Sequence, residues 1–168
     1  LRGFDYDKKF VFSEIGYNFE PSEIGATFGI QQIKKFKYFN KIRNRNFKMH
    51  FNFFKKFPDL FITPKIINKV STNFLAYPII LKNVKLFNRK EIQIYLENNN
   101  IQTRPIFSGN ILRHPAFSKL ISKENNLNSF KNSDFIMKNG LLIGCHQGLT
   151  IQKIKYIYKK IINFLNSQ

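Results

Sequence analysis

The chain has 168 residues, a formal net charge of +18 and a sequence pI of about 10.1. Apolar runs such as 74–77 and 79–81 are far too short to cross a bilayer, so we expect no membrane insertion. A single cysteine, Cys145, excludes an internal disulfide, and no signal-peptide pattern opens the sequence, so we expect a cytoplasmic protein.

The positive charge has two possible explanations. Taken alone, it suggests a nucleic-acid partner, and a basic nucleic-acid-binding protein is therefore one hypothesis. However, the 22 lysines outnumber the 6 arginines and are spread along the chain, whereas a nucleic-acid reader would concentrate arginine. Lys, Asn, Ile and Phe together form about half of the sequence, and all four have A/T-rich codons. We therefore expect genome composition to account for the charge, and no nucleic-acid partner.

The N-terminal part predicts a short extended piece, residues 10–19, followed by a helix. Ser22 is a suitable N-cap because its side chain can accept hydrogen bonds from the first turn. The helix then carries Gly25 and Gly29, each of which costs about 1 kcal/mol relative to alanine. Two glycines one turn apart indicate a helix surface that another backbone approaches closely.

An apolar stripe at helical spacing continues over residues 34–57 among lysines, arginines and asparagines. It predicts one long or bent helix whose phenylalanines pack in a core rather than stacking on bases. Residues 72–81 then predict a strand with Pro78 at an edge or a bulge. Asn88 is the expected N-cap of a helix that ends at the asparagine triplet 98–100.

The last third of the chain continues the alternation of strands and helices. Residues 102–107 predict a strand and a polar loop follows, with helical segments expected after Pro115 and over 129–139. Residues 141–144 predict a buried strand, and Thr150 is the expected cap of a final amphipathic helix. This order predicts a compact α/β or α+β unit of about 110 residues.

Three segments resemble the DegT/DnrJ/StrS family of sugar-nucleotide aminotransferases and dehydratases. FSEIGYNFEPSEIGATFGIQQIKKF, residues 12–36, resembles the Gly-Tyr-Asn segment and following helix of the family. IQTRPIFSGNILRHPAF, residues 101–117, resembles the Thr-Arg-x-x-Phe-x-Gly-Asn-x-x-Arg-x-Pro segment of the dehydratase branch and is the more specific. LLIGCHQGLT, residues 141–150, resembles a late strand and turn. The resemblance covers nearly all of the chain.

The resemblance implies an α/β fold, namely the C-terminal part of a fold-type I, aspartate aminotransferase-like enzyme. Residues 1–57 would be the end of the large cofactor-binding domain with the connecting long helix, and residues 58–168 the small α+β domain. The family forms homodimers with shared active sites, and its cofactor-anchoring histidine or lysine would lie upstream of Leu1. We therefore expect no catalytic residue in this chain, which alone would be inactive.

The dehydratase branch, which resembles the 3-dehydratases of CDP-4-keto-6-deoxyglucose, implies a 3-dehydratase acting on a nucleotide-linked 4-keto-6-deoxyhexose, with pyridoxal or pyridoxamine 5'-phosphate as cofactor. Its product would serve deoxysugar synthesis for lipopolysaccharide O-antigen or similar glycans. An aminotransferase of the same family, with lysine at the anchoring position, is the nearest alternative, and an inactive truncated product is another. Some dehydratase relatives hold an iron–sulfur cluster through several cysteines, whereas Cys145 is single and expected to pack in the interior.

The expected cofactor-binding residues are Asn18 and its neighbour Tyr17. Asn18 matches the family asparagine that reaches across the dimer to the cofactor phosphate. An amide can donate to a phosphate oxygen, and a turn before a helix N-terminus suits an anion. The alternative is an asparagine that only favours a turn.

The expected substrate-binding residues are Arg104, Asn110, Arg113 and His146. Two guanidinium groups and an amide suit the diphosphate and hydroxyls of a nucleotide sugar, and Gly109 lets their loop turn tightly. The alternative is that an arginine simply pairs with a carboxylate. The resemblance places His146 near the mouth of the active site. One cysteine and three scattered histidines predict no metal site.

Overall fold

A computed structural model of the chain describes residues 14–17, 19–68, 70–82, 85–120 and 127–168. The chain divides into two units, residues 1–36 and 37–168. Helix α1 (Glu23–Phe54) begins in the first unit and ends in the second. The domain boundary predicted after residue 57 lies just beyond the end of this helix and stays a prediction.

The first turn of α1 forms as predicted. Ser22 Oγ accepts a hydrogen bond from the Gly25 N–H at 3.4 Å, and the Ser22 carbonyl oxygen accepts from the Ala26 N–H at 2.9 Å. In the first unit the apolar side chains of the helix are exposed, Ile24 by 84% and Phe28 by 67%. Apart from its chain neighbours and the backbone of its own helix, no described atom lies within 4 Å of a Cβ built on Gly29, so the close backbone expected there is not supplied by the described residues.

The second unit contains a four-stranded antiparallel sheet in the order β1-β2-β4-β3. The strands are β1 (Phe61–Ile62), β2 (Ala76–Leu81), β3 (Thr103–Pro105) and β4 (Gly140–Gly144). The strands predicted at 72–81, 102–107 and 141–144 are therefore confirmed, the first two with shorter bounds.

Pro78 occupies the middle of β2, opposite Leu142 of β4. On the other side of β2, β1 pairs only with Leu81 and Ile80. In the described sheet Pro78 therefore has a strand on one side only, which is locally the edge position predicted for it. A proline, which lacks a backbone N–H, is tolerated there because no second ladder needs that donor.

The helices of the second unit carry the predicted caps. They are α2 (Arg89–Asn98), α3 (Lys131–Asn139) and α4 (Ile151–Asn166), with 3₁₀ turns at Ile111–Arg113, Pro115–Leu120 and Leu127–Phe130. Asn88 forms a complete capping box with Glu91, and Thr150 Oγ1 accepts from the Lys153 N–H at 3.2 Å. No helix among the described residues is long and apolar enough to cross a membrane.

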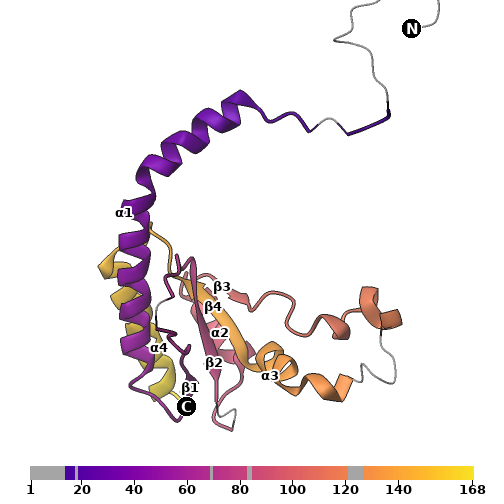
Figure 1. Cartoon of the computed structure of the whole chain (residues 1–168). Helices are drawn as coiled ribbons and strands as arrows, with labels where there is room; N and C mark the ends of the chain where they lie inside the picture. The colour runs from indigo at the N-terminus through magenta and orange to yellow at the C-terminus, as the bar shows by residue number, and fades with distance from the viewer. Residues whose placement is uncertain (1–13, 18, 69, 83–84, 121–126) are drawn as a thin grey trace, which may run out of the picture. The chain divides into compact units, whose positions relative to one another are not determined.

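The core lies where the second half of α1 and α4 cover one face of the sheet (Figure 1). The ring of Phe54 stacks on Tyr77 of β2 at 5.4 Å, and Phe53 stacks on Tyr158 of α4 at 4.0 Å. A fully buried side chain such as Phe54 contributes roughly 1.5–3 kcal/mol through the hydrophobic effect. The core role predicted for the phenylalanines of 34–57 is thus confirmed for Phe47, Phe53 and Phe54, whereas Phe36 is 53% exposed.

Candidate functional site

A hollow of about 720 Å³ opens beside the edge strand β3, between β3, β4 and the first half of α4. Its lining includes two cationic side chains, Arg104 and Lys153, and the hydrogen-bonding side chains of His146 and Tyr156. No aspartate or glutamate is among the described residues that line it. Such a lining favours an anionic or polar molecule over a cation. Two of the predicted substrate-binding residues, Arg104 and His146, are thus brought together.

Arg104 lies in β3 opposite Leu142 of β4, and its Nη1 donates to the Thr103 carbonyl oxygen at 3.0 Å. The Thr103 hydroxyl donates to the Glu97 carboxylate at 2.6 Å. The pKa of Glu97 is lowered first by this hydrogen bond, then by one from Gln93 and by the charge of Arg104. In the described structure no carboxylate forms an ion pair with Arg104. Its remaining N–H groups can therefore serve a ligand.

His146 lies in the turn between β4 and α4. Its Nδ1 accepts a hydrogen bond from the Gly148 N–H at 3.1 Å, which places the proton of the neutral ring on Nε2. The ring is closely flanked by backbone, because a Cβ added at Gly148 would lie 3.1 Å from Nδ1 and one at Gly144 would lie 3.4 Å from Cδ2. The Nε2–H group is therefore the donor that this ring can offer to the hollow.

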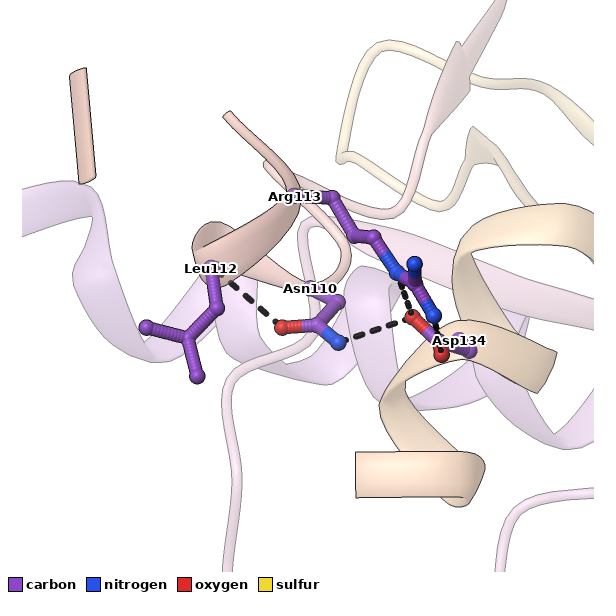
Figure 2. Close-up of polar contacts among 4 residues, drawn as sticks. All are labelled: Asn110, Leu112, Arg113 and Asp134. Atoms are coloured by element: carbon purple, nitrogen blue, oxygen red, sulfur yellow. Dashed lines mark hydrogen bonds and ion pairs between the residues drawn. The ribbon is translucent and has the colours of Figure 1, made fainter. Parts of the chain in front are cut away.

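Asn110 and Arg113 form a separate cluster around Asp134 of α3 (Figure 2). Arg113 binds both carboxylate oxygens, Nε to Oδ1 at 2.9 Å and Nη2 to Oδ2 at 2.5 Å, and Asn110 Nδ2 donates to Oδ1 at 2.7 Å. Asn110 Oδ1 also accepts from the Leu112 N–H at 3.2 Å. The Arg113 hydrogen bond, followed by that of Asn110, lowers the pKa of Asp134 to about 2.

Arg113 forms an ion pair with Asp134, which is the alternative stated for an arginine of this loop, namely pairing with a carboxylate. Asp134, in the first turn of α3, was not singled out from the sequence, because nothing in the spacing shows which of the 10 acidic residues faces the loop. The substrate-binding roles of Asn110 and Arg113 stay predictions. Neither residue is among those that line the hollow of Arg104 and His146.

Gly109 confirms the tight turn expected in the loop. Its φ is +61°, and a Cβ there would lie 2.5 Å from both Cβ and Cγ of Met137 in α3. Phe107, two residues earlier, also has a positive φ of 46° and is 88% exposed. The loop is therefore held against α3 by a glycine contact and by the Asp134 cluster together.

Cys145 and His114 both contact other parts of the chain. Cys145 packs in the core as predicted, where burial raises the pKa of its thiol to about 12. His114 Nε2 lies 2.8 Å from the Ser108 carbonyl oxygen. Among the described residues no three His, Cys, Asp or Glu side chains are grouped as a metal ion would require.

The predicted cofactor residues belong to the first unit. Asn18 lies outside the described residues. Tyr17 is 87% exposed, and its ring lies 5.5 Å from that of Phe19. Its hydroxyl is thus accessible as a hydrogen-bond donor.

Comparison with known proteins relates residues 1–162 to the DegT/DnrJ/EryC1/StrS aminotransferase family. The chain is 29% identical over 160 residues, 95% of its length, to dTDP-4-dehydro-2,6-dideoxy-D-glucose 3-dehydratase of Saccharopolyspora spinosa, covering 34% of that protein. It is 29% identical over 159 residues, 95% of its length, to lipopolysaccharide biosynthesis protein RfbH of Salmonella typhimurium, covering 36% of it. It thus spans about a third of the length of these relatives.

Two further comparisons bear on the reaction type and the fold. A dTDP-4-amino-4,6-dideoxy-D-glucose transaminase of Escherichia coli is 29% identical over 122 residues, which are 73% of this chain and 33% of that protein. A crystal structure of E. coli GDP-4-keto-6-deoxy-D-mannose-3-dehydratase with bound hydrated PLP matches with a TM-score of 0.75 and 28% identity, over 92% of this chain and 39% of that one. The expected fold, that of part of a PLP-dependent sugar dehydratase or aminotransferase, is confirmed.

Proposed function

Since the chain belongs to the DegT/DnrJ/EryC1/StrS aminotransferase family, we propose that it is the C-terminal part of an enzyme that removes the C3 hydroxyl from a nucleotide-linked 4-keto-6-deoxyhexose. The observation that best supports this is the hollow that Arg104 and His146 share, a largely apolar hollow to which Arg104 and Lys153 add positive charge, without a carboxylate among its described residues. The similarity to 3-dehydratases along nearly the whole chain supports the same reaction. The product would enter deoxysugar synthesis for lipopolysaccharide O-antigen, in the cytoplasm.

The proposed substrate contacts follow from the donors that remain free. Arg104 would donate to diphosphate oxygens, because its guanidinium offers several N–H groups and uses one on Thr103. His146 would donate its Nε2–H to a sugar hydroxyl or carbonyl oxygen. Arg113 would use Nη1, which Asp134 does not engage, and Asn110 the second N–H of its amide.

The proposal includes pyridoxal or pyridoxamine 5'-phosphate as the cofactor. Asn18 and Tyr17 would donate to its phosphate, and the exposed hydroxyl of Tyr17 fits that task because phosphate oxygens only accept. The cofactor supplies, when bound, the electron sink that the elimination requires. Asn18 would serve the active site of a second subunit, which makes a homodimer part of the proposal.

An aminotransferase is the second candidate, favoured by the 29% identity to a sugar-nucleotide transaminase. The two reactions differ in the fate of C3 and C4. A dehydratase product lacks the C3 oxygen and keeps the C4 ketone, whereas a transaminase product keeps the C3 hydroxyl and carries an amine at C4.

The test uses the full-length protein as its cells make it, with PLP, glutamate and a CDP-, GDP- or dTDP-linked 4-keto-6-deoxyhexose. Mass spectrometry and NMR of the recovered sugar distinguish the outcomes. Loss of the C3 oxygen with the ketone retained supports the proposal. A 4-amino sugar would establish the alternative, and unchanged sugar with every nucleotide would overturn both.

A further inference from the structure

The turn that carries His146 is held by hydrogen bonds from α1, about a hundred residues earlier in the chain. The Arg43 Nε group donates to the side chain of Gln147 at 2.8 Å, and the Cys145 thiol lies 3.6 Å from the Arg43 carbonyl oxygen. The Arg45 Nη2 group donates to the Leu149 carbonyl oxygen at 3.3 Å. Side chains of one helical segment thus contact the turn along its length.

Asn46 is the centre of these contacts. It is fully buried, and its amide nitrogen faces three carbonyl oxygens of the turn, those of His146 at 3.0 Å, Leu149 at 3.4 Å and Cys145 at 3.5 Å. Its Oδ1 accepts from Nε and Nη2 of Arg45 at 3.1 and 2.9 Å. Carbonyl oxygens only accept and a guanidinium only donates, so both sides impose the same orientation of the amide.

The position of the turn decides where the imidazole of His146 lies. The Nδ1 atom accepts from Gly148 within the same turn, and the ring is flanked by Gly144 and Gly148 at distances that leave little room. The Leu149 N–H closes the turn on the His146 carbonyl oxygen at 3.2 Å. That carbonyl is also the one nearest to Asn46. A shift of this peptide would therefore move the ring relative to the hollow.

We propose that Asn46 is a positioning residue: its amide fixes the 145–149 turn and thereby holds the Nε2–H of His146 toward the hollow. The relevance of this to substrate rests on the proposed function, but the geometry itself can be tested without any substrate. Removing the amide takes a shared donor from three carbonyl oxygens. The His146 and Leu149 carbonyl oxygens keep the Leu149 N–H and Arg45 Nη2, so the loss loosens the link between α1 and the turn and lets the turn shift.

The experiment compares the full-length protein with its Asn46→Ala and Asn46→Asp variants by ¹⁵N–¹H NMR of the histidine rings. Asn46→Asp keeps the size of the side chain and removes both N–H donors. The matched control is Asn44→Ala, two residues away on the same helix, whose amide bonds, within the described part of the chain, to Asn40 alone, at 2.9 and 2.5 Å. His50, buried in the core, reports in every spectrum whether the fold is intact.

The wild-type chain and Asn44→Ala should show His146 as the Nε2–H tautomer with a protected Gly148 N–H. In Asn46→Ala the tautomers should mix and the Gly148 amide should exchange about tenfold faster, with the His50 signals unchanged. An unchanged His146 tautomer in Asn46→Ala, with Gly148 equally protected, would overturn the proposal, as would equal changes in Asn44→Ala. Should Asn46→Asp not fold, Asn46→Ala decides alone. Neither outcome depends on whether a nucleotide sugar binds.

Discussion

The hydroxyl of Tyr158 lies 3.2 Å from Nδ1 of His50, inside the core between α1 and α4. The other ring nitrogen, Nε2, lies 3.1 Å from the Gly144 carbonyl oxygen. Because a carbonyl only accepts, Nε2 carries the proton and Nδ1 accepts from Tyr158. Burial lowers the pKa of His50 to about 4, although the Gly144 hydrogen bond acts in the opposite direction. The core is therefore built around a neutral imidazole.

This neutral histidine predicts a loss of stability in mild acid. Between pH 6.5 and 4 the unfolded chain binds a proton on residue 50 that the native chain does not. The contribution of neutral His50 to the free energy of unfolding is thus fully present above pH 6.5. It is lost as the pH falls toward 4, and the total loss is about 3 kcal/mol. Urea unfolding across this range should show the fall in wild type and a flatter profile in His50→Gln. In the control His114→Gln, the free energy of unfolding should fall with pH as in wild type. If His50→Gln shows the same fall, another titrating group causes it.

The Asp134 cluster predicts a second, more acidic transition. The pKa of Asp134 lies below its usual 3.8, at about 2. The contribution of the ionised carboxylate to folding stability is therefore present above pH 3.8 and is lost as the pH falls through 2. Asp134→Asn should release the 109–113 loop, seen as faster amide exchange of Leu112 and Arg113 at neutral pH. Asn110→Ala should lower the free energy of unfolding because it removes a part-buried hydrogen bond to a charged group. Asp59 lies in an exposed turn, so Asp59→Asn is the control and should change neither the amide exchange of the loop nor the free energy of unfolding.

Two glycines predict opposite responses to alanine. Gly109→Ala should destabilise the chain by about 2–4 kcal/mol, because its left-handed φ is unfavourable for alanine and the new methyl group meets Met137. Gly29→Ala lies in a helix with nothing within 4 Å and should stabilise the helix by about 1 kcal/mol. Thermal and urea unfolding followed by circular dichroism measures both. A Gly109→Ala variant as stable as wild type would show that the loop is not held against α3.

Local signals in the sequence were sufficient for the helix starts but not for the partners of the loops. Ser22, Asn88 and Thr150 cap helices as predicted, because a cap acts on the backbone two or three residues away. Asp134 and Asn46 were missed, because Asp134 contacts a loop 21 to 24 residues away in the sequence and Asn46 contacts a turn 99 to 103 residues away. Nothing in their own neighbourhood distinguishes them from the other aspartates and asparagines of the chain.

The candidate site shows the same limit. The sequence predicted three substrate-binding residues in the 101–117 segment and His146 in the 141–150 segment, and the structure brings Arg104 and His146 to one hollow but Asn110 and Arg113 to Asp134. The pairing of β3 with β4 puts Arg104 beside the strand that leads to His146. That pairing is a long-range contact, and the strand pattern alone does not specify it.

The hollow predicts that Arg104 binds the anionic part of a nucleotide sugar. Arg104→Gln should weaken the binding of GDP or dTDP by at least about tenfold, because a charge-assisted hydrogen bond contributes roughly 1.5–3 kcal/mol. Arg104→Lys keeps the charge but loses the fork of donors, so it should restore only part of the affinity. Isothermal titration of the protein in its cellular length measures these values. Lys90→Gln, an exposed cation on α2, is the control for net charge. An equal loss in Lys90→Gln would mean that the +18 chain attracts nucleotides through charge alone, and an unchanged affinity in Arg104→Gln would remove Arg104 from the site.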